Sequence, residues 1–118
     1  MRIIILILLI SFASNAWANS VVTGSAGSRL EGEVVSKFNK PWAMSFINND
    51  NLLITTKGGK LWLVNRSGEQ SLVSEVPKVF EGGQGGLGDV VPHPNYKKNK
   101  LVYISYINSD DEGKTRYA

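Results

Sequence analysis

The sequence contains no cysteine among its 118 residues and only one histidine, His93. The lack of cysteine excludes disulfide bonds, thiolate metal sites and a cysteine nucleophile, so the folded chain must be held by its core alone. His93 precedes Pro94 in an expected turn, and no serine constellation near it indicates a charge relay. By itself His93 therefore supports no catalytic role.

A strong excess of charge of either sign is also missing. The 13 Lys and Arg residues face 10 Asp and Glu residues, which gives a formal charge of +3 at pH 7. Such a small excess does not indicate a nucleic-acid partner. The densest basic cluster, Lys97, Lys98 and Lys100, lies among polar residues, and we interpret it as a solvated turn rather than a binding patch.

Long apolar runs are scarce, and the longest one, residues 3–10, lies near the N-terminus. It follows Arg2 and precedes the small residues of Ala16-Trp17-Ala18, which is the layout of a secretory signal peptide. The run is much shorter than the roughly 20 residues that cross a bilayer. We predict cleavage after Ala18, a periplasmic or secreted protein, and no membrane span after cleavage. Removal of residues 1–18 takes Arg2 with it and lowers the formal charge to +2.

The remaining chain divides into a short lead-in and a region of alternating strands and turns. Residues 19–33 show no sustained periodicity and are predicted to be a flexible lead-in. Residues 34–118 form the expected domain, in which no segment has a helical hydrophobic period of useful length. The predicted strands are residues 34–38, 42–47, 52–56, 60–65, 71–74, 89–91, 101–106 and 114–118.

Short strands separated by turns indicate an all-β sandwich, barrel or propeller. Residues 52–54 and 61–64 are apolar on both faces, which favours sheets that stack on one another. The strand series repeats after about 45 residues, a spacing typical of propeller blades. The second series stops in an expected strand at residue 118, so we predict about two N-terminal blades of a propeller that is incomplete in this chain.

The glycine-rich residues 82–88 satisfy the pattern Gly83-x-Gly85-x-x-Gly88 of dinucleotide-binding folds. That pattern binds a pyrophosphate only when a helix follows it, and residues 89–92, which end in a proline, do not open a helix. A nucleotide site is therefore disfavoured. The glycines instead favour close approach of the backbone, with Gln84 presented as an amide donor and acceptor.

Two acidic features could indicate a function, but the sequence favours a structural interpretation of both. Asn108-x-Asp110-x-Glu112 resembles the first half of a calcium loop, but the acid of the twelfth position would be residue 119. A solvated acidic turn is the preferred interpretation. Asp89 is a conceivable base beside Gln84, yet no neighbouring titratable residue has a spacing that would tune it, so a structural role is favoured.

Three pieces of the chain carry a recognisable pattern. They are residues 40–46 (KPWAMSF), residues 52–55 with 59–61 (LLIT and GKL), and residues 82–89 (GGQGGLGD), which continue into residues 93–96 (HPNY) and 99–106 (NKLVYISY). Together these pieces resemble the beginning of soluble PQQ-dependent aldose sugar dehydrogenases, the glucose/sorbosone dehydrogenase family. The GGQGGL piece is the most specific of them. The resemblance covers residues 34–118, and it departs from the pattern at Thr55-Thr56-Lys57, where many members have Thr-Glu-Arg.

The resemblance implies a six-bladed β-propeller with PQQ in a central cleft. It assigns one cofactor-binding residue in this chain, Gln84, and no catalytic or metal-binding residue, because the family's catalytic histidine, basic PQQ anchors and calcium ligands belong to later blades. It further implies PQQ and calcium as cofactors, and an aldose sugar and an electron acceptor as partners of a full-length protein. The isolated chain is expected to be inactive.

Two other interpretations remain open at this point. The first is a non-enzymatic propeller module that binds carbohydrate or a protein, because a fold does not dictate a function. The second is a small self-contained β protein that completes its sheets between chains.

Overall fold

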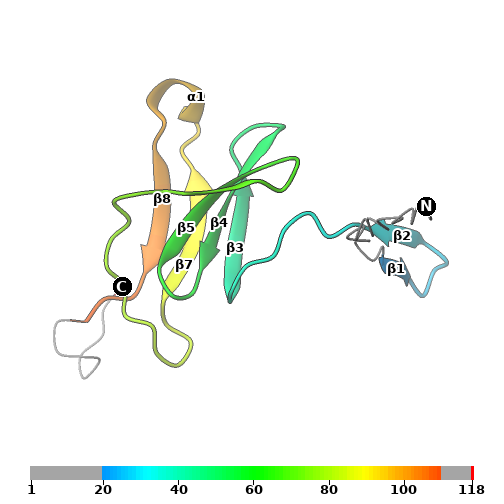
Figure 1. Ribbon diagram of the computed structural model, residues 1–118, viewed down its shortest axis with the longest axis horizontal. Coiled ribbons are helices and arrows are strands. Elements are labelled where there is room, and N and C mark those ends of the chain that lie inside the picture. Colours follow the sequence, from blue (N-terminus) through cyan, green and yellow to red (C-terminus); the bar gives the residue numbers. More distant parts are fainter. Residues whose placement is uncertain (1–19, 110–117) are drawn as a thin grey trace, which may run out of the picture. The chain divides into compact units, whose positions relative to one another are not determined.

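A computed structural model describes residues 20–109 and residue 118 (Figure 1). The chain divides into two compact units, Met1–Val34 and Val35–Ala118. The predicted signal peptide, Asp110, Glu112 and residues 114–117 of the last predicted strand lie outside the described residues. Within the described ranges, no helix is long and apolar enough to cross a membrane.

The first unit contains a β-hairpin formed by β1 (Ser20–Thr23) and β2 (Arg29–Gly32). The turn closes with a hydrogen bond from the Gly24 amide to the Ser28 carbonyl, 2.8 Å long. All eight strand residues are exposed. Strands of four residues are too short for a periodicity to reveal them, so the lead-in was expected to have no regular structure. Its flexibility stays a prediction.

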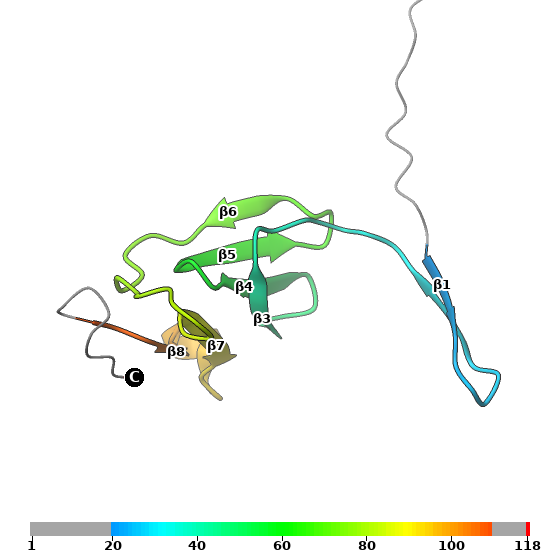
Figure 2. The same cartoon turned by 90° about the horizontal axis from the view of Figure 1, so that it is seen from below.

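The second unit is built on a four-stranded antiparallel sheet in the order β3-β4-β5-β6 (Figure 2). The strands are β3 (Pro41–Phe46), β4 (Asn51–Thr56), β5 (Lys60–Asn65) and β6 (Gln70–Leu72). Their bounds confirm four predicted strands to within two residues. Each strand pairs with the next along the chain, which is the meander expected from short turns.

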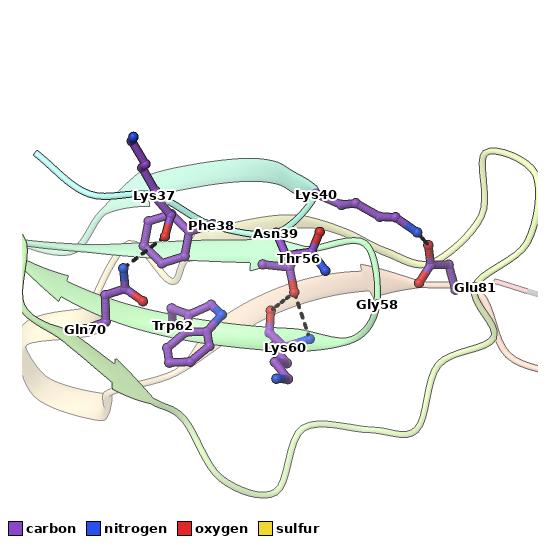
Figure 3. A pocket seen from close by; sticks show the side chains of 10 residues that line it. All are labelled: Lys37, Phe38, Asn39, Lys40, Thr56, Gly58, Lys60, Trp62, Gln70 and Glu81. Atoms are coloured by element: carbon purple, nitrogen blue, oxygen red, sulfur yellow. Dashed lines mark hydrogen bonds and ion pairs between the residues drawn. The ribbon is translucent and has the colours of Figure 1, made fainter. Parts of the chain in front are cut away.

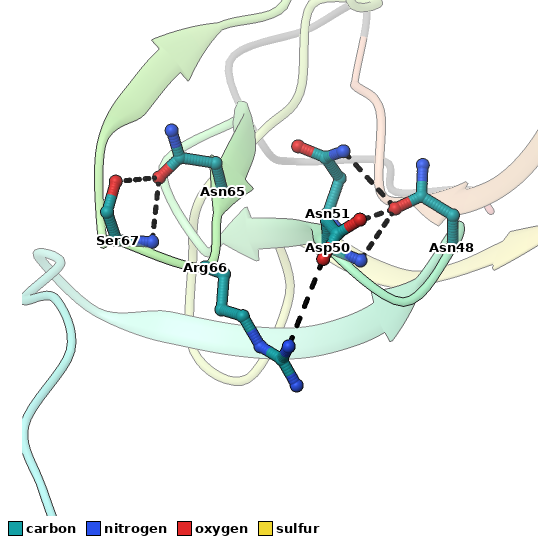
Figure 4. A network of polar contacts seen from close by, with 6 residues as sticks. All are labelled: Asn48, Asp50, Asn51, Asn65, Arg66 and Ser67. Atoms are coloured by element: carbon teal, nitrogen blue, oxygen red, sulfur yellow. Dashed lines mark hydrogen bonds and ion pairs between the residues drawn. The ribbon is translucent and has the colours of Figure 1, made fainter.

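Asparagine side chains stabilise the turns at one end of this sheet (Figure 4). Asn48 Oδ1 accepts hydrogen bonds from the backbone amides of Asp50 and Asn51, at 2.9 and 2.8 Å. Asn65 Oδ1 does the same for the Ser67 amide, at 3.1 Å. Because an asparagine side chain can imitate a backbone turn, the Asn/Asp cluster in the sequence correctly located the β3-β4 hairpin.

The strand predicted at residues 34–38 is wrong, because residues 33–38 have no regular structure. Their polar groups bond to the β5-β6 hairpin instead: Ser36 Oγ donates to the Gly68 carbonyl at 3.1 Å, and Gln70 Nε2 donates to the Lys37 carbonyl at 3.1 Å. The Phe38 ring lies 6.1 Å from that of Trp62. Phe38 thus packs over the sheet without pairing as part of a strand, while Val34 and Val35 are exposed.

A second, two-stranded antiparallel sheet consists of β7 (Leu87–Pro92) and β8 (Val102–Tyr106). A single helical turn, α1 (Tyr96–Asn99), lies between them and is too short to give a hydrophobic period. Lys97 and Lys98 are exposed on it, as predicted for a solvated turn.

The core lies where the two sheets meet. Leu53 of β4 and Leu61 of β5 pack with Leu87 and Val90 of β7, and each is at most 5% exposed. Burial of this kind contributes roughly 1.5–3 kcal/mol for each such side chain. The stacked sheets predicted from the doubly apolar strands are confirmed.

Candidate functional site: the Gln84 turn and its cavity

Gln84 lies at the tip of a tight turn within the glycine-rich segment. Gly82 and Gly85 exchange two backbone hydrogen bonds across the turn, of 3.2 and 2.8 Å. Gly83 has a φ of +58°, whereas Gln84 is not among the residues with positive φ. This combination is that of a type II′ turn, which requires glycine at its first central position. The turn leaves Gln84 exposed at its tip.

Glycine is needed through this segment because neighbouring groups come close to its backbone. A Cβ atom on Gly82 would lie 2.6 Å from Cε1 of Phe80, and one on Gly88 would lie 2.5 Å from Ser105 Oγ. A Cβ atom on Gly86 would overlap the carbonyl oxygen of Lys57. The close backbone approach expected from the glycine run is therefore present.

The turn borders a cavity of about 190 Å³. Its lining residues are Trp42, Gln84, Gly85, Gly86, Leu87, Gly88, Ser105, Tyr106, Ile107 and Ala118. The lining residues thus include two with aromatic side chains, one with a carboxamide and two with a hydroxyl group. An apolar, partly aromatic wall with a few polar groups is the usual composition of a site for a planar organic ligand.

A buried threonine holds the end of the glycine segment. Thr55 of β4 is fully buried, and its hydroxyl donates to the Gly88 carbonyl at 2.7 Å while it accepts from the Ala43 amide at 3.1 Å. One side chain thus links β3, β4 and the start of β7. The glycine-rich segment and its cavity are also contacted by Trp42, Thr55 and Lys57, whereas the sequence indicated a site role only for Gln84. Trp42 and Thr55 lie in two of the pieces that carry the resemblance, which was the available signal, whereas Lys57 lies where the chain departs from the family pattern.

His93 and Asp89, the other side chains weighed from the sequence, do not line this cavity. The His93 Nδ1 atom lies 2.9 Å from the Asn95 amide and from the Asn99 side-chain nitrogen, so the imidazole organises the turn before β8. Asp89 is exposed on β7. In the described part of the chain, no three His, Cys, Asp or Glu residues are grouped to hold a metal ion.

The literal dinucleotide pattern is not a nucleotide site. The segment after the glycines is strand β7 (Leu87–Pro92), not a helix, so no helix N-terminus faces the turn. The reason given from the sequence for rejecting that site is confirmed.

A larger cavity, of about 320 Å³, does not include Gln84 (Figure 3). Several of its polar groups already bond to one another: Lys40 Nζ lies 2.6 Å from Glu81 Oε1, and Thr56 Oγ1 lies 3.3 Å from the Lys60 backbone. The hydrogen bond from Lys40 lowers the pKa of Glu81 below its ordinary value of 4.5, and the charge of Lys57 lowers it further. The polar groups in these two pairs are therefore less available to bind a ligand.

Comparisons with known proteins bear directly on the glycine-rich segment. The sequence profile of the glucose / sorbosone dehydrogenase family matches residues 38–118. The chain is 36% identical over 113 residues to the aldose sugar dehydrogenase YliI of Escherichia coli, covering 92% of this chain and 28% of that protein. It is 31% identical over 101 residues to quinoprotein glucose dehydrogenase B of Acinetobacter calcoaceticus, covering 77% of this chain and 21% of that protein.

Solved structures agree with the sequence comparisons. The crystal structure of the soluble aldose sugar dehydrogenase of Escherichia coli in its apo-form superimposes with a TM-score of 0.58 at 36% identity, covering 64% of this chain and 22% of that one. The predicted fold class, an all-β chain that forms part of a propeller, is thereby confirmed. The chain spans about a quarter of the length of these relatives. From the matched residues and the shared structure, the chain belongs to the glucose/sorbosone dehydrogenase family.

Proposed function

We propose that this chain is the N-terminal part of a PQQ-dependent aldose sugar dehydrogenase that works in the periplasm, and that it contributes Gln84 to the cofactor pocket. The cavity that brings Gln84 and Trp42 together carries the proposal. The relative named quinoprotein glucose dehydrogenase supports the choice of a quinone cofactor.

The residues of the cavity fit one part of a planar quinone. The exposed Trp42 ring offers an aromatic surface, and the Gln84 carboxamide can both donate to and accept from polar substituents. No basic side chain lines the cavity among the described residues, and the described chain offers no group of calcium ligands. The residues that would bind the cofactor carboxylates and the calcium ion must therefore come from elsewhere.

When bound, PQQ supplies the two-electron redox chemistry of such an enzyme. In this proposal, Gln84 would hold a polar substituent of the cofactor and Trp42 would offer it an aromatic surface. The family resemblance assigns the base that removes the sugar proton to later blades, so this chain is not expected to supply it. The isolated chain is accordingly inactive in this proposal.

The test uses the longest open reading frame that begins with this chain, assayed for aldose-dependent dye reduction with added PQQ and calcium. We expect activity from that product and none from the 118-residue chain. The variant Gln84→Ala is expected to need about tenfold more PQQ for half-maximal activity, because one hydrogen bond to a polar ligand is lost. Gln70→Ala, in the larger cavity, is the matched control and should leave the PQQ requirement unchanged.

A longer product that binds carbohydrate or protein without reducing the dye would replace the enzyme by a non-enzymatic propeller module. An equal PQQ requirement for the wild type and the Gln84→Ala variant would remove Gln84 from the cofactor pocket.

A further inference from the structure

Lys57, the first residue after β4, contacts the glycine-rich segment on both sides of Gln84. Its Nζ atom donates a hydrogen bond to the Gly83 carbonyl, immediately before Gln84. Its own carbonyl accepts a hydrogen bond of 3.1 Å from the Leu87 amide, after Gln84. Between these two bonds, a Cβ atom on Gly86 would lie 2.8 Å from Lys57 Cγ. Lys57 thus contacts the turn that presents Gln84 both before and after that residue.

Lys57 is itself held by the sheet. Its amide donates a 3.0 Å hydrogen bond to the Lys40 carbonyl, just before β3. Thr55, two residues earlier, is fully buried and bonded to Gly88. Thr55 within β4 and Lys57 just beyond its end thus both hold the glycine-rich segment.

From these contacts we propose that Lys57 is a positioning residue for Gln84, which fixes the direction of the carboxamide toward the cavity. The positioning of Gln84 does not depend on the proposed function, but its consequence for cofactor binding rests on it. The type II′ turn has a two-residue tip, and a glycine within it gives the backbone little stiffness. The backbone hydrogen bonds of the sheets do not extend to this tip. The charge-assisted bond from Lys57 to the Gly83 carbonyl restrains it instead.

The alternative explanation is that Lys57 only adds to the general stability of the sheet or attracts anions by its charge. The two explanations predict different behaviour. A positioning role acts locally on residues 83–87 and depends on the geometry of the donor. A contribution to general stability acts on all strands together, and a simple charge effect is screened by salt.

The experiment compares amide hydrogen exchange and NMR spectra of the ¹⁵N-labelled 118-residue chain with those of three variants, all in a Met44→Lys, Phe46→Lys background that removes two exposed apolar side chains and limits self-association. Lys57→Met keeps the aliphatic stem and removes the ammonium group, and Lys57→Arg retains a cationic donor. Lys60→Met is the matched control, because Lys60 is an exposed lysine at the start of β5, three residues after Lys57, and its Nζ lies 5.8 Å from the Trp62 ring centroid.

We expect Lys57→Met to speed exchange of the Gly85 and Leu87 amides about tenfold and to shift the Gln84 side-chain amide signals, with β4 and β5 unchanged. Lys57→Arg should restore most of the protection, and Lys60→Met should have no effect. The local change should persist at high salt. Unchanged exchange in Lys57→Met, an equal increase across all strands, or an effect abolished by salt would each overturn the proposal.

A measurement on the wild-type chain keeps the proposal testable if Lys57→Met does not fold. The ¹⁵Nζ relaxation of Lys57 should show an ordered ammonium group, in contrast to that of Lys60. An ammonium group as mobile as that of Lys60 would refute the positioning role. Neither measurement uses PQQ, so the results for Lys57 would stand even if Gln84 proved not to bind the cofactor. A failure of this inference and a failure of the proposed function can therefore be told apart.

Discussion

Thr55 is the residue on which several elements depend at once. It is a polar side chain at 0% exposure, and its single oxygen lies within hydrogen-bonding distance of Ala43 in β3 and Gly88 in β7. A buried hydroxyl is tolerated only when it is satisfied in this way. Because its partners belong to both sheets, the hydroxyl joins the β3-β6 sheet to the strand that leaves the Gln84 turn.

Replacing Thr55 by valine keeps the shape of the side chain and leaves the Ala43 amide and the Gly88 carbonyl without this partner. We expect the free energy of unfolding to fall by about 1–3 kcal/mol. Urea unfolding followed by circular dichroism measures the change. Thr55→Ser retains the hydroxyl and should lose less, and a valine variant as stable as the wild type would show that the hydroxyl is dispensable.

Glu81 gives a pH dependence whose direction can be stated. The hydrogen bond from Lys40 lowers its pKa below 4.5, while partial burial opposes this shift and the charges of Lys40 and Lys57 add to it. A carboxyl group with a lowered pKa stabilises the fold above its unfolded pKa, and this contribution disappears as the pH falls through the folded pKa. The contribution should therefore be constant from neutral pH to about 5.

Titration of the Glu81 side-chain carbon signal by NMR tests this assignment. We expect a midpoint below 4.5 in the wild type and a higher midpoint in Lys40→Met, which lacks the donor. Lys37→Met removes another lysine that lines the same cavity and should move the midpoint less. Equal midpoints in the wild type and in Lys40→Met would show that the 2.6 Å contact is not formed in solution.

At the level of elements, the glycine-rich segment is attached to the end of β4 by direct backbone contact. The Leu87 amide bonds to the Lys57 carbonyl, and the Ile107 amide bonds to the Gly86 carbonyl at 2.9 Å. Gly86 is buried and leaves no space for a side chain on the face toward Lys57. The position of the turn over the cavity is therefore decided by backbone packing as well as by side chains.

Gly86→Ala should accordingly be costly. The added methyl group meets backbone atoms, which cannot rotate away, so we expect a loss of about 2–3 kcal/mol in the free energy of unfolding. Gly58→Ala is the control, because there the new methyl group meets the flexible end of Glu81 at 3.2 Å. Thermal unfolding of both variants is the measurement, and similar midpoints would contradict the close contact at Gly86.

On the scale of the complete chain, one face of the four-stranded sheet carries a row of apolar side chains, which are exposed on β3 and β6 and half-buried on β4 and β5. Met44, Ile54, Trp62 and Leu72 are paired across the four strands, and Met44 and Leu72 are 66% and 57% exposed. Phe46, two residues after Met44 on the same face, is 60% exposed. Exposed apolar residues grouped on one face of a sheet favour association.

We therefore expect the 118-residue chain to self-associate at micromolar concentration and to bind the dye ANS. The double variant Met44→Lys, Phe46→Lys should be more monomeric in analytical ultracentrifugation and bind less dye. Val22→Lys changes an equally exposed apolar residue in the separate hairpin and serves as the control. A wild-type chain that sediments as a monomer without dye binding would count against association through this face.

Local chemistry in the sequence was sufficient for the strands and turns of the sheet. Alternating and doubly apolar runs located β3, β4 and β5, and the Asn48–Asn51 cluster located their first turn, because these signals depend on neighbours in the chain. The same signals failed at residues 34–38, where Phe38 packs over the sheet from a segment without regular structure, and at β1, β2 and α1, which are too short to show a period. The GGQGGL piece indicated the family, which the comparisons then confirmed.

From the residues alone follow a mainly β chain without disulfides, the strands β3 to β6 in their order, and a glycine turn that presents Gln84. The fold adds three contacts: Trp42 shares a cavity with Gln84, Thr55 is buried between two sheets, and Lys57 bonds to the Gln84 turn. The physical reason is that these contacts join residues about 26 to 42 positions apart, and no local propensity encodes such pairings. They form only when β7 packs against β3 and β4 and brings the glycine backbone to the end of the sheet.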